Sequence, residues 1–396
     1  MSDARRQLTA LGKQRLFWPV LILAALLLSN LFFTPGFFSI EMRNGHLYGS
    51  LIDILRASTP LILVAVGMTV VIATGGIDLS VGSVMAISGA IACLHISGLT
   101  DQNSVAGMFL AVAMALGLSL LLGLWNGALV SLIGIQPIIA TLILMVAGRG
   151  LAQLITDGQI INVNSAPYKV IGAGYALTLP VSVLIVAGVV TAAALLIRRS
   201  ALGMLVESVG GNPTASRLAG IRARQLVILA YVFTGLCAGI AGLIFSSNVS
   251  SADGNNAGNL IELDAILAVV IGGTALTGGR FSLAGSVLGA VIIKSLDITI
   301  YTIGIPSEAT LLFKALVVIV LCLAQSSAFR ARISGLGRGG AGRGGPPRPP
   351  GSPPGQRSGE STGDSTGDGP TGDGQPRQAG PAAQTAAGQT AAEAPA

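Results

Sequence analysis

Long apolar stretches alternate with short polar segments along most of the chain before residue 327. Many of these stretches approach the roughly 20 apolar residues that a helix needs to cross a bilayer. A window of about 19 residues gives candidate spans at 17–38, 58–73, 81–98, 105–134, 136–156, 176–197, 226–247, 263–276, 283–300 and 308–326. The pattern predicts an all-α, polytopic membrane protein of about ten spans, and short or glycine-interrupted spans are expected to be broken or re-entrant.

Composition and charge support a membrane protein. The chain is 52% hydrophobic and 10% charged, whereas about a quarter of the residues of soluble domains are charged. The net charge of +6 comes largely from Lys and Arg near the ends of spans, a pattern that orients membrane proteins and does not indicate a nucleic-acid partner. Because basic residues precede the first span and crowd residues 198–224, we expect both regions and both termini in the cytoplasm.

The sequence divides into three parts. Residues 1–16 form a basic N-terminal segment, residues 17–327 form the transmembrane domain with a polar loop at 198–225, and residues 328–396 form a Gly/Pro/Ala-rich tail. The tail contains little that can fill a core, so we expect it to be disordered and cytoplasmic. A signal peptide is the alternative for the N-terminus, but no small-residue cleavage site follows before Asn30, which favours an uncleaved span.

The stretch ATGGIDLSVGSV places two glycines and a carboxylate inside an apolar region. Gly75 and Gly76 permit backbone angles that break a helix, and the freed backbone groups then need partners. Asp78 and Ser80 can supply these partners where the next helix begins. Two interpretations of Asp78 remain open: a helix cap inside the membrane, or the wall of a polar pathway that accepts hydrogen bonds from a polyol.

A second stretch repeats part of the first. TGGRFSLAGSV at Thr277–Val287 matches TGGIDLSVGSV at Thr74–Val84 in TGG and in GSV, with one constant offset. Glycine-rich membrane sequences can match by chance, but paired glycine-interrupted segments are a frequent sign of repeats around a transporter's central site. We therefore expect an internal repeat.

The polar loop ESVGGNPTASRLAGIR contains the signals of a short helix. Asn212 is a good N-cap, Pro213 suits the first turn, and Gly220 suits the exit. The loop is therefore expected to hold an exposed helix of about two turns. It is either an ordinary amphipathic connector or an element that transmits motion from a separate ATPase.

Other polar residues within the spans need partners as well. Asn126 and Gln153 are expected to hydrogen-bond to neighbouring helices more readily than to a sugar. Arg149 needs a buried partner or a role in the pathway, and Asp264 is interpreted as a helix cap. The candidate translocation path consists of Gly75, Gly76, Asp78, Ser80, Asn126 and Arg149.

Catalytic chemistry has no sequence support. The chain lacks a G-x-x-x-x-G-K-[ST] phosphate loop, which argues against ATP hydrolysis by that route on this polypeptide. His46 and His95, the two histidines, belong to no nucleophile–histidine–acid set, and the three cysteines have no metal-binding spacing. We expect a protein that is not an enzyme and that has no catalytic residue, no metal site and no cofactor of its own.

Three stretches together resemble a known family: ATGGIDLSVGSVMAISGA, ESVGGNPTASRLAGI and NNAGNLIELDAILAVVIGGTALTGGRFSLAGSVLGA. They are similar to the inner-membrane permease subunits of bacterial carbohydrate ABC importers, the ribose, xylose and galactose permease family. The resemblance covers roughly residues 45–327. It implies an inner-membrane protein that imports a monosaccharide by alternating access, with galactofuranose or a similar furanose or pentose as the expected cargo.

The resemblance also implies partners. These are an ATPase subunit that carries ATP and Mg²⁺, a periplasmic sugar-binding protein, a second identical or similar permease, and membrane lipid. The residues implied in ATPase coupling are Glu207, Gly211, Asn212, Pro213, Arg217 and Gly220. Those expected to meet the binding protein are Asp253, Asn255, Asn256 and Glu262. The alternative function is a self-sufficient, ion-coupled secondary transporter or channel, which would need its own coupling carboxylates within the spans.

Overall fold

Helices make up most of the chain that the computed structural model describes, which comprises residues 17–33, 37–43, 45–304 and 306–325. All of these residues belong to one compact unit, residues 1–339. The expectations for the N-terminal segment 1–16 and for the tail 328–396 lie outside the described residues.

A helix lies in each of the predicted spans. These helices are α2 (Phe17–Phe33), α3 (Ser50–Ala73), α4 (Val81–Ser97), α5 (Val105–Ala128) with the π-helical η1 (Leu129–Ile133), α6 (Pro137–Ile155), α8 (Val181–Arg199), α11 (Ala223–Val249), α12 (Ile261–Ile271), α13 (Leu283–Ile303) and α14 (Ser307–Gln325). Among the described residues, six helices are long and apolar enough to cross a membrane: α3, α5 with η1, α6, α8, α11 and α13. The chain is therefore a polytopic helical protein, although α4 and α12, with 17 and 11 residues, are short.

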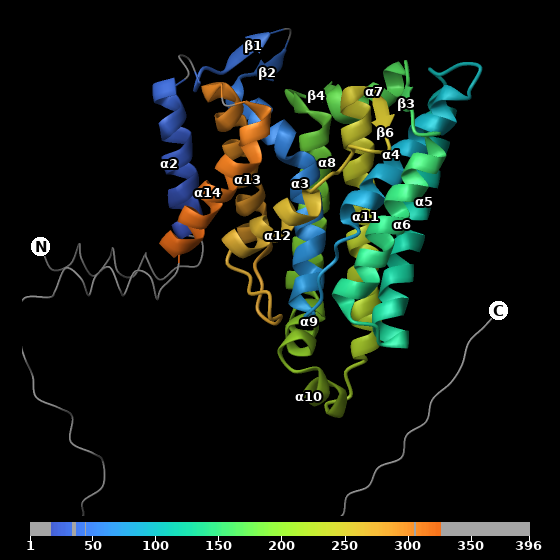
Figure 1. The fold of residues 1–396 in the computed structure, drawn as a ribbon, viewed down its shortest axis with the longest axis vertical. Coiled ribbons are helices and arrows are strands. Elements are labelled where there is room, and N and C mark those ends of the chain that lie inside the picture. Colours follow the sequence, from blue (N-terminus) through green and yellow to red (C-terminus); the bar gives the residue numbers. More distant parts are fainter. Residues whose placement is uncertain (1–16, 34–36, 44, 305, 326–396) are drawn as a thin grey trace, which may run out of the picture. The chain divides into compact units, whose positions relative to one another are not determined.

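The remaining elements lie at the two ends of the helix bundle (Figure 1). At one end, called the strand face below, lie α7 (Ala166–Ala173) and three antiparallel strand pairs. The pairs are β1 (Glu41–Arg43) with β2 (His46–Tyr48), β3 (Ile160–Asn162) with β6 (Ser251–Asp253), and β4 (Tyr175–Ala176) with β5 (Leu179–Pro180). The opposite end, called the α10 face, carries α9 (Leu202–Gly211) and α10 (Pro213–Leu218).

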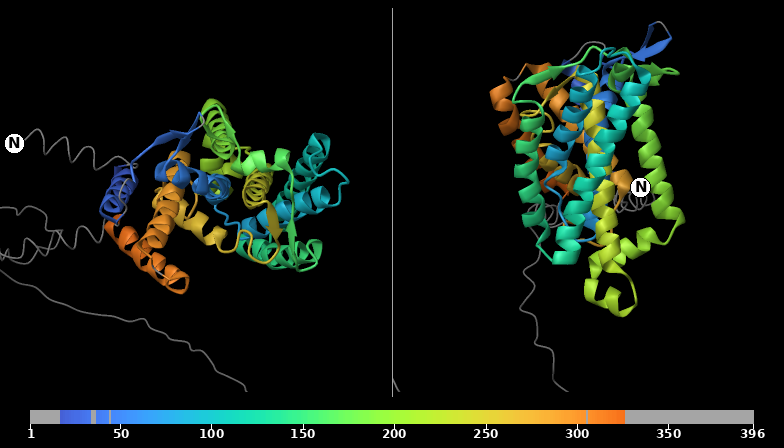
Figure 2. Two further views of the ribbon diagram at one scale, coloured as in Figure 1. Left: turned by 90° about the horizontal axis from the view of Figure 1, so that it is seen from above. Right: turned by 90° about the vertical axis from the view of Figure 1, so that its right-hand side faces the viewer.

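Helix α11 is the centre of the bundle and packs against α3, α4 and α5 (Figure 2). The approach to α4 is so close that a Cβ atom on Gly242 would lie 2.2 Å from the Met85 carbonyl oxygen. Apolar side chains gain little by leaving apolar lipid, so small residues that allow backbones to touch supply much of the contact between membrane helices. The abundance of glycine in this chain is therefore consistent with close helix packing.

An ion network joins α12, α13 and α14. The ammonium group of Lys314 lies 2.7 Å from the Asp264 carboxylate and 3.0 Å from the Asp297 carboxylate. Lys294 lies 2.9 Å from Asp297 on the same helix. The interpretation of Asp264 as a helix cap is wrong, because α12 has no side-chain cap and Asp264 pairs with Lys314. The network ties α14 to α12 and α13, the helices on either side of residues 272–282.

Lys314→Met tests this network. Removing Lys314 leaves Asp264 without its cation, and breaking a buried pair from one side costs about 3–5 kcal/mol. We expect a clearly lower thermal unfolding temperature for the purified protein. Lys294→Met is the matched control and should lower it less, because Asp297 keeps Lys314. A Lys314→Met/Asp264→Leu double variant should recover part of the loss, and equal losses in both single variants would contradict this account.

Candidate functional site

The first break, residues 74–80, begins with a regular helix ending. Helix α3 stops at Ala73, and Gly75 has a φ of 86°. The Gly75 N–H donates to the Ile72 carbonyl at 2.9 Å, and the Gly76 N–H donates to the Val71 carbonyl at 3.1 Å. These two bonds form the Schellman ending, in which a left-handed glycine satisfies the last free carbonyls of a helix. The chain then runs without helix until α4 begins.

The second break, residues 272–282, follows α12, and α12 ends in the same way as α3. Gly273 has a φ of 85°, its N–H donates to the Val270 carbonyl at 2.9 Å, and the Thr274 N–H donates to the Val269 carbonyl at 3.2 Å. Gly278, the counterpart of Gly75 in the repeated motif, has a φ of 86°. Both breaks thus consist of a helix, a left-handed glycine and a restarting helix, although the second is longer. The glycine that ends α12 is Gly273, however, and not Gly278, so the helix endings do not coincide with the repeated motif.

The two breaks and α9 meet at the α10 face. The Gly279 N–H donates to the Ala73 carbonyl at 2.9 Å, which joins the second break to the end of α3. A Cβ atom on Gly278 would lie 3.0 Å from the Gly75 Cα, and one on Gly210 of α9 would lie 1.8 Å from the Ala73 carbonyl oxygen. Glycine at position 210 is therefore required by the contact, since any side chain would push the segments apart.

A buried polar cluster lies where α4 begins. The Ser80 backbone N–H and hydroxyl donate to Asp78 Oδ1 at 2.9 and 2.6 Å, and Asn126 Nδ2 of α5 donates to the Ser80 hydroxyl at 2.8 Å. Asp78 is 2% exposed, Ser80 1% and Asn126 0%. The structure therefore brings these three predicted residues together, with the carboxylate turned onto the backbone of the N-cap.

Two further residues support this cluster from other helices. Thr141 of α6 and Tyr231 of α11 donate through their hydroxyl groups to the Ile77 carbonyl at 3.3 and 3.4 Å. Sequence analysis missed both, because a threonine and a tyrosine in apolar helices carry no signal of the segment they face. The Ile77 carbonyl of the first break is thus held by α6 and α11, and α5 holds the Ser80 side chain.

Arg149 belongs to a different group. Its Nη1 donates to the carbonyl of Ala257 at 2.6 Å and to that of Gly254 at 3.4 Å, so it binds the segment between β6 and α12. Nearby, Gln153 Nε2 donates to Asn255 Oδ1 at 2.8 Å. The predicted pathway residues therefore fall into two sets, the cluster around Asp78 and the contact that Arg149 makes with this segment.

The residues predicted to meet a binding protein differ in exposure. Asn255 and Asn256 are exposed on a turn whose backbone N–H groups donate to Asp253. Burial would raise the pKa of Asp253, but hydrogen bonds from the Asn256 side chain and these N–H groups outweigh it, so the pKa lies below its ordinary value. Glu262 is 7% exposed, and a Cβ atom on Gly82 would lie 2.5 Å from its Oε2. Glu262 therefore faces the start of α4 rather than solvent.

The predicted loop helix is present with both of its caps. The Ala215 N–H donates to Asn212 Oδ1 at 2.9 Å, and Pro213 opens the helix. Gly220 has a φ of 82°, and the following Ile221 N–H donates to the Ser216 carbonyl at 3.0 Å, which closes a Schellman ending. The predicted loop residues Gly211, Asn212, Pro213, Arg217 and Gly220 are exposed.

An exposed apolar side chain accompanies these residues. Leu218 is 87% exposed at the end of α10. Glu207 of α9 is half-buried beside a cavity of about 520 Å³, which it lines together with Arg280 and glycines of the second break. Sequence analysis did not single out Leu218, because a lone leucine in a polar loop is ordinary until its exposure is known.

Comparison with known proteins identifies the family. A family described as "Branched-chain amino acid transport system / permease component" matches residues 50–322. The galactofuranose transporter permease protein YtfT of Escherichia coli is 48% identical over 336 residues, 83% of this chain and 96% of that protein. The fructose import permease protein FruF of Bifidobacterium longum is 43% identical over 317 residues, 78% of this chain and 87% of that protein.

A ribose import permease is more distant. The RbsC protein of Haemophilus influenzae is 36% identical over 318 residues, 79% of this chain and 93% of that protein. No solved structure matches the chain. The expected resemblance to carbohydrate permeases is confirmed. The chain therefore belongs to the branched-chain amino acid transport system / permease component family and is a multi-pass inner-membrane transport protein.

Proposed function

We propose that this chain is the membrane-spanning subunit of an ATP-driven importer that carries a monosaccharide inward, with galactofuranose or a similar furanose or pentose as cargo. Its similarity to sugar permeases over most of their length supports this choice of substrate. ATP and Mg²⁺ are bound by a separate ATPase, a periplasmic protein delivers the sugar, and a second permease, identical or similar, completes the path. Both termini and the α10 face are cytoplasmic, as the arginines of that region favour.

One observation carries the proposal. Gly210 touches Ala73, the last residue of α3, where the first break begins, and lies beside the second break. It is only two residues from Asn212, the cap of α10. A displacement of α10 is therefore transmitted through α9 directly to both breaks. Leu218 and Arg217 at the tip of α10 are exposed for contact with the ATPase.

The polar cluster around Asp78 then lies between the end of α3, which α9 contacts, and the start of α4. We assign Asp78 to holding Ser80, the N-cap residue of α4, because its carboxylate oxygen accepts both the N–H and the hydroxyl hydrogen of Ser80 and is nearly inaccessible. No side chain caps α4 directly. Asn126 orients Ser80 from the neighbouring helix. Arg149 holds the segment between β6 and α12, in which Asn255 and Asn256 remain exposed toward the delivering protein.

ATP dependence is the direct test of the proposed function. In proteoliposomes that contain the permease, the ATPase and the sugar-binding protein of the same importer, uptake of labelled galactofuranose should require all three proteins and ATP. The permease alone should give no uptake when a proton gradient is imposed. Uptake by the permease alone that follows the gradient would identify an ion-coupled secondary transporter instead.

Gly210→Ala tests the contact between α9 and the breaks. The added methyl group overlaps the Ala73 carbonyl, and overpacking of this kind costs about 1–3 kcal/mol. We expect less sugar taken up per ATP hydrolysed, with ATP hydrolysis retained. Gly188→Ala on α8 is the matched control, because a Cβ atom there meets nothing within 4 Å. Normal transport per ATP in Gly210→Ala would remove this contact from the mechanism.

Asp78 can be tested with two substitutions that separate its hydrogen bonding to Ser80 from its charge. Asp78→Asn keeps an acceptor for the Ser80 N–H, so uptake should stay close to normal. Asp78→Ala leaves that buried N–H unpaired at a cost of about 1–3 kcal/mol, and we expect lower stability and lower uptake. Complete loss of uptake in a normally inserted Asp78→Asn variant would show that the carboxylate charge itself is needed.

A further inference from the structure

An apolar groove opens between α8, α9 and α11 near the α10 face. Its volume is about 100 Å³, and its walls include Leu196 and Ile197 of α8, Leu202 and Val206 of α9, and Leu226 and Leu229 of α11. All of its lining side chains are apolar. Leu196 and Leu229 remain 56% and 51% exposed. The described part of the chain therefore leaves this apolar surface uncovered.

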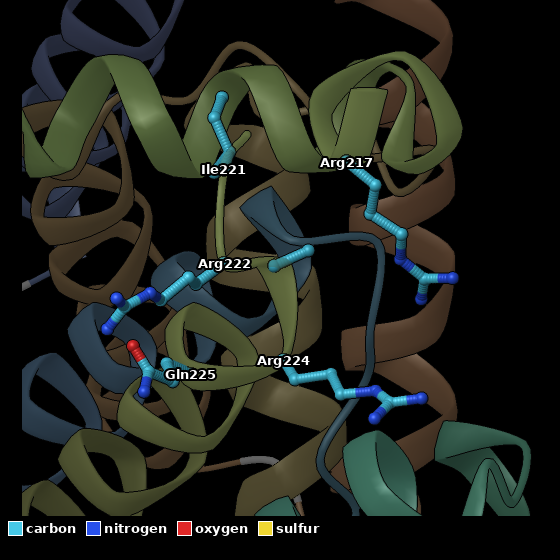
Figure 3. Close-up of a pocket in the computed structure, with 6 residues that line it drawn as sticks. Arg217, Ile221, Arg222, Arg224 and Gln225 are labelled. Carbon is cyan, nitrogen blue, oxygen red and sulfur yellow. The ribbon is translucent and has the colours of Figure 1, made fainter. Parts of the chain in front are cut away.

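Basic residues stand at the mouth of the groove. Arg199 ends α8 three residues after Leu196. Residues three or four apart share one face of a helix, so Gln225 lies on the same face of α11 as the groove residue Leu229. Figure 3 shows Arg222 and Gln225 pointing to one side, whereas Arg217 and Arg224 point to the other. Arg222 is the N-cap of α11 and lies four residues before the groove residue Leu226.

The arginines at the groove have no anionic partner among the described residues. Arg199 and Arg222 are exposed. Neither α8 nor α11 contains an aspartate or glutamate, and Glu207 of the third wall, α9, lines the separate cavity beside Arg280. A guanidinium group presents a planar fork of donors that matches a phosphate group, and this makes arginine well suited to binding phosphate. The mouth of the groove is thus positively charged and ready to bind an anion.

The position of the groove decides which anion fits. It lies at the ends of α8 and α11, two helices long and apolar enough to span the bilayer, so lipid chains and headgroups meet at this depth. We propose that the groove binds one anionic phospholipid, with an acyl chain between α8, α9 and α11 and the phosphate at Arg199 and Arg222. An acidic segment of a protein would satisfy the arginines but would leave the apolar walls uncovered.

The lipid becomes part of the packing of α9. Leu202, Val206 and Gly210 follow one another at intervals of four residues, so the stripe that faces the groove continues into the contact with Ala73. The bound lipid therefore supports α9 on the side that leads to both breaks. This role concerns binding and stability and stands independently of which solute is transported.

The test uses the purified full-length permease in detergent, titrated with phosphatidylglycerol or phosphatidylcholine, with bound lipid counted by native mass spectrometry. Phosphatidylglycerol should bind more tightly and should raise the thermal unfolding temperature. Arg199→Gln/Arg222→Gln should weaken its binding by about 25-fold, from roughly one kcal/mol for each arginine. Arg224→Gln/Arg280→Gln removes the same charge from the same face of the bundle and should leave binding unchanged.

A second variant tests the apolar part of the site. Leu226→Trp fills the groove and keeps every arginine, so a monodisperse Leu226→Trp protein should also lose phosphatidylglycerol. Unchanged binding in this variant would overturn the proposal, as would equal binding of the two lipids or equal losses in the two arginine variants. Loss of ATPase binding without loss of lipid in Arg199→Gln/Arg222→Gln would assign these arginines to a protein partner and would overturn it too.

Discussion

The structure depends on one constraint: backbone N–H and C=O groups freed by a helix break inside a membrane must find partners within the protein. At the first break, the N–H groups of Gly75 and Gly76 close the end of α3, and the N–H of Ser80 is taken up by Asp78. The second break satisfies the Ala73 carbonyl through the N–H of Gly279. Each break therefore completes the hydrogen bonding of the other, and neither can be displaced alone without losing a bond.

Close packing follows from the same constraint. A hydrogen bond between two backbones requires that no side chain separate them, and Gly210, Gly278 and Gly279 meet this requirement at the α10 face. Helix α9 thus touches the breaks through backbone atoms rather than through side chains that could rotate away. A contact of this kind transmits displacement, because no side-chain rotation can absorb it.

Sequence analysis succeeded where the signal lies within a few residues. The caps of α10 and the left-handed glycine of the first break could be predicted because Asn212, Gly220 and Gly75 act on backbone atoms next to them. The approximate positions of the helices followed from hydropathy for the same reason. The number of helices that cross the whole membrane could not be predicted, because the length of an apolar run does not show where a helix stops within the membrane.

Contacts between distant segments were missed or misread. Asp264 was interpreted as a cap because its partner, Lys314, lies 50 residues away along the chain. Glu262 was predicted to meet a binding protein together with Asn255 and Asn256, yet it is buried against α4. Such errors share one cause. A polar residue in an apolar helix needs a partner, but the sequence does not show which helix provides that partner.

The two breaks also differ in the side chains that they carry. The first carries Asp78 and Ser80, buried among α4, α5, α6 and α11, whereas the corresponding part of the second carries the exposed Arg280. A repeat whose copies had equal roles would place similar chemistry at both positions. The first break therefore holds buried polar side chains, and the second, which lies between Ala73 and α9, holds the contact with α9 and with the end of α3.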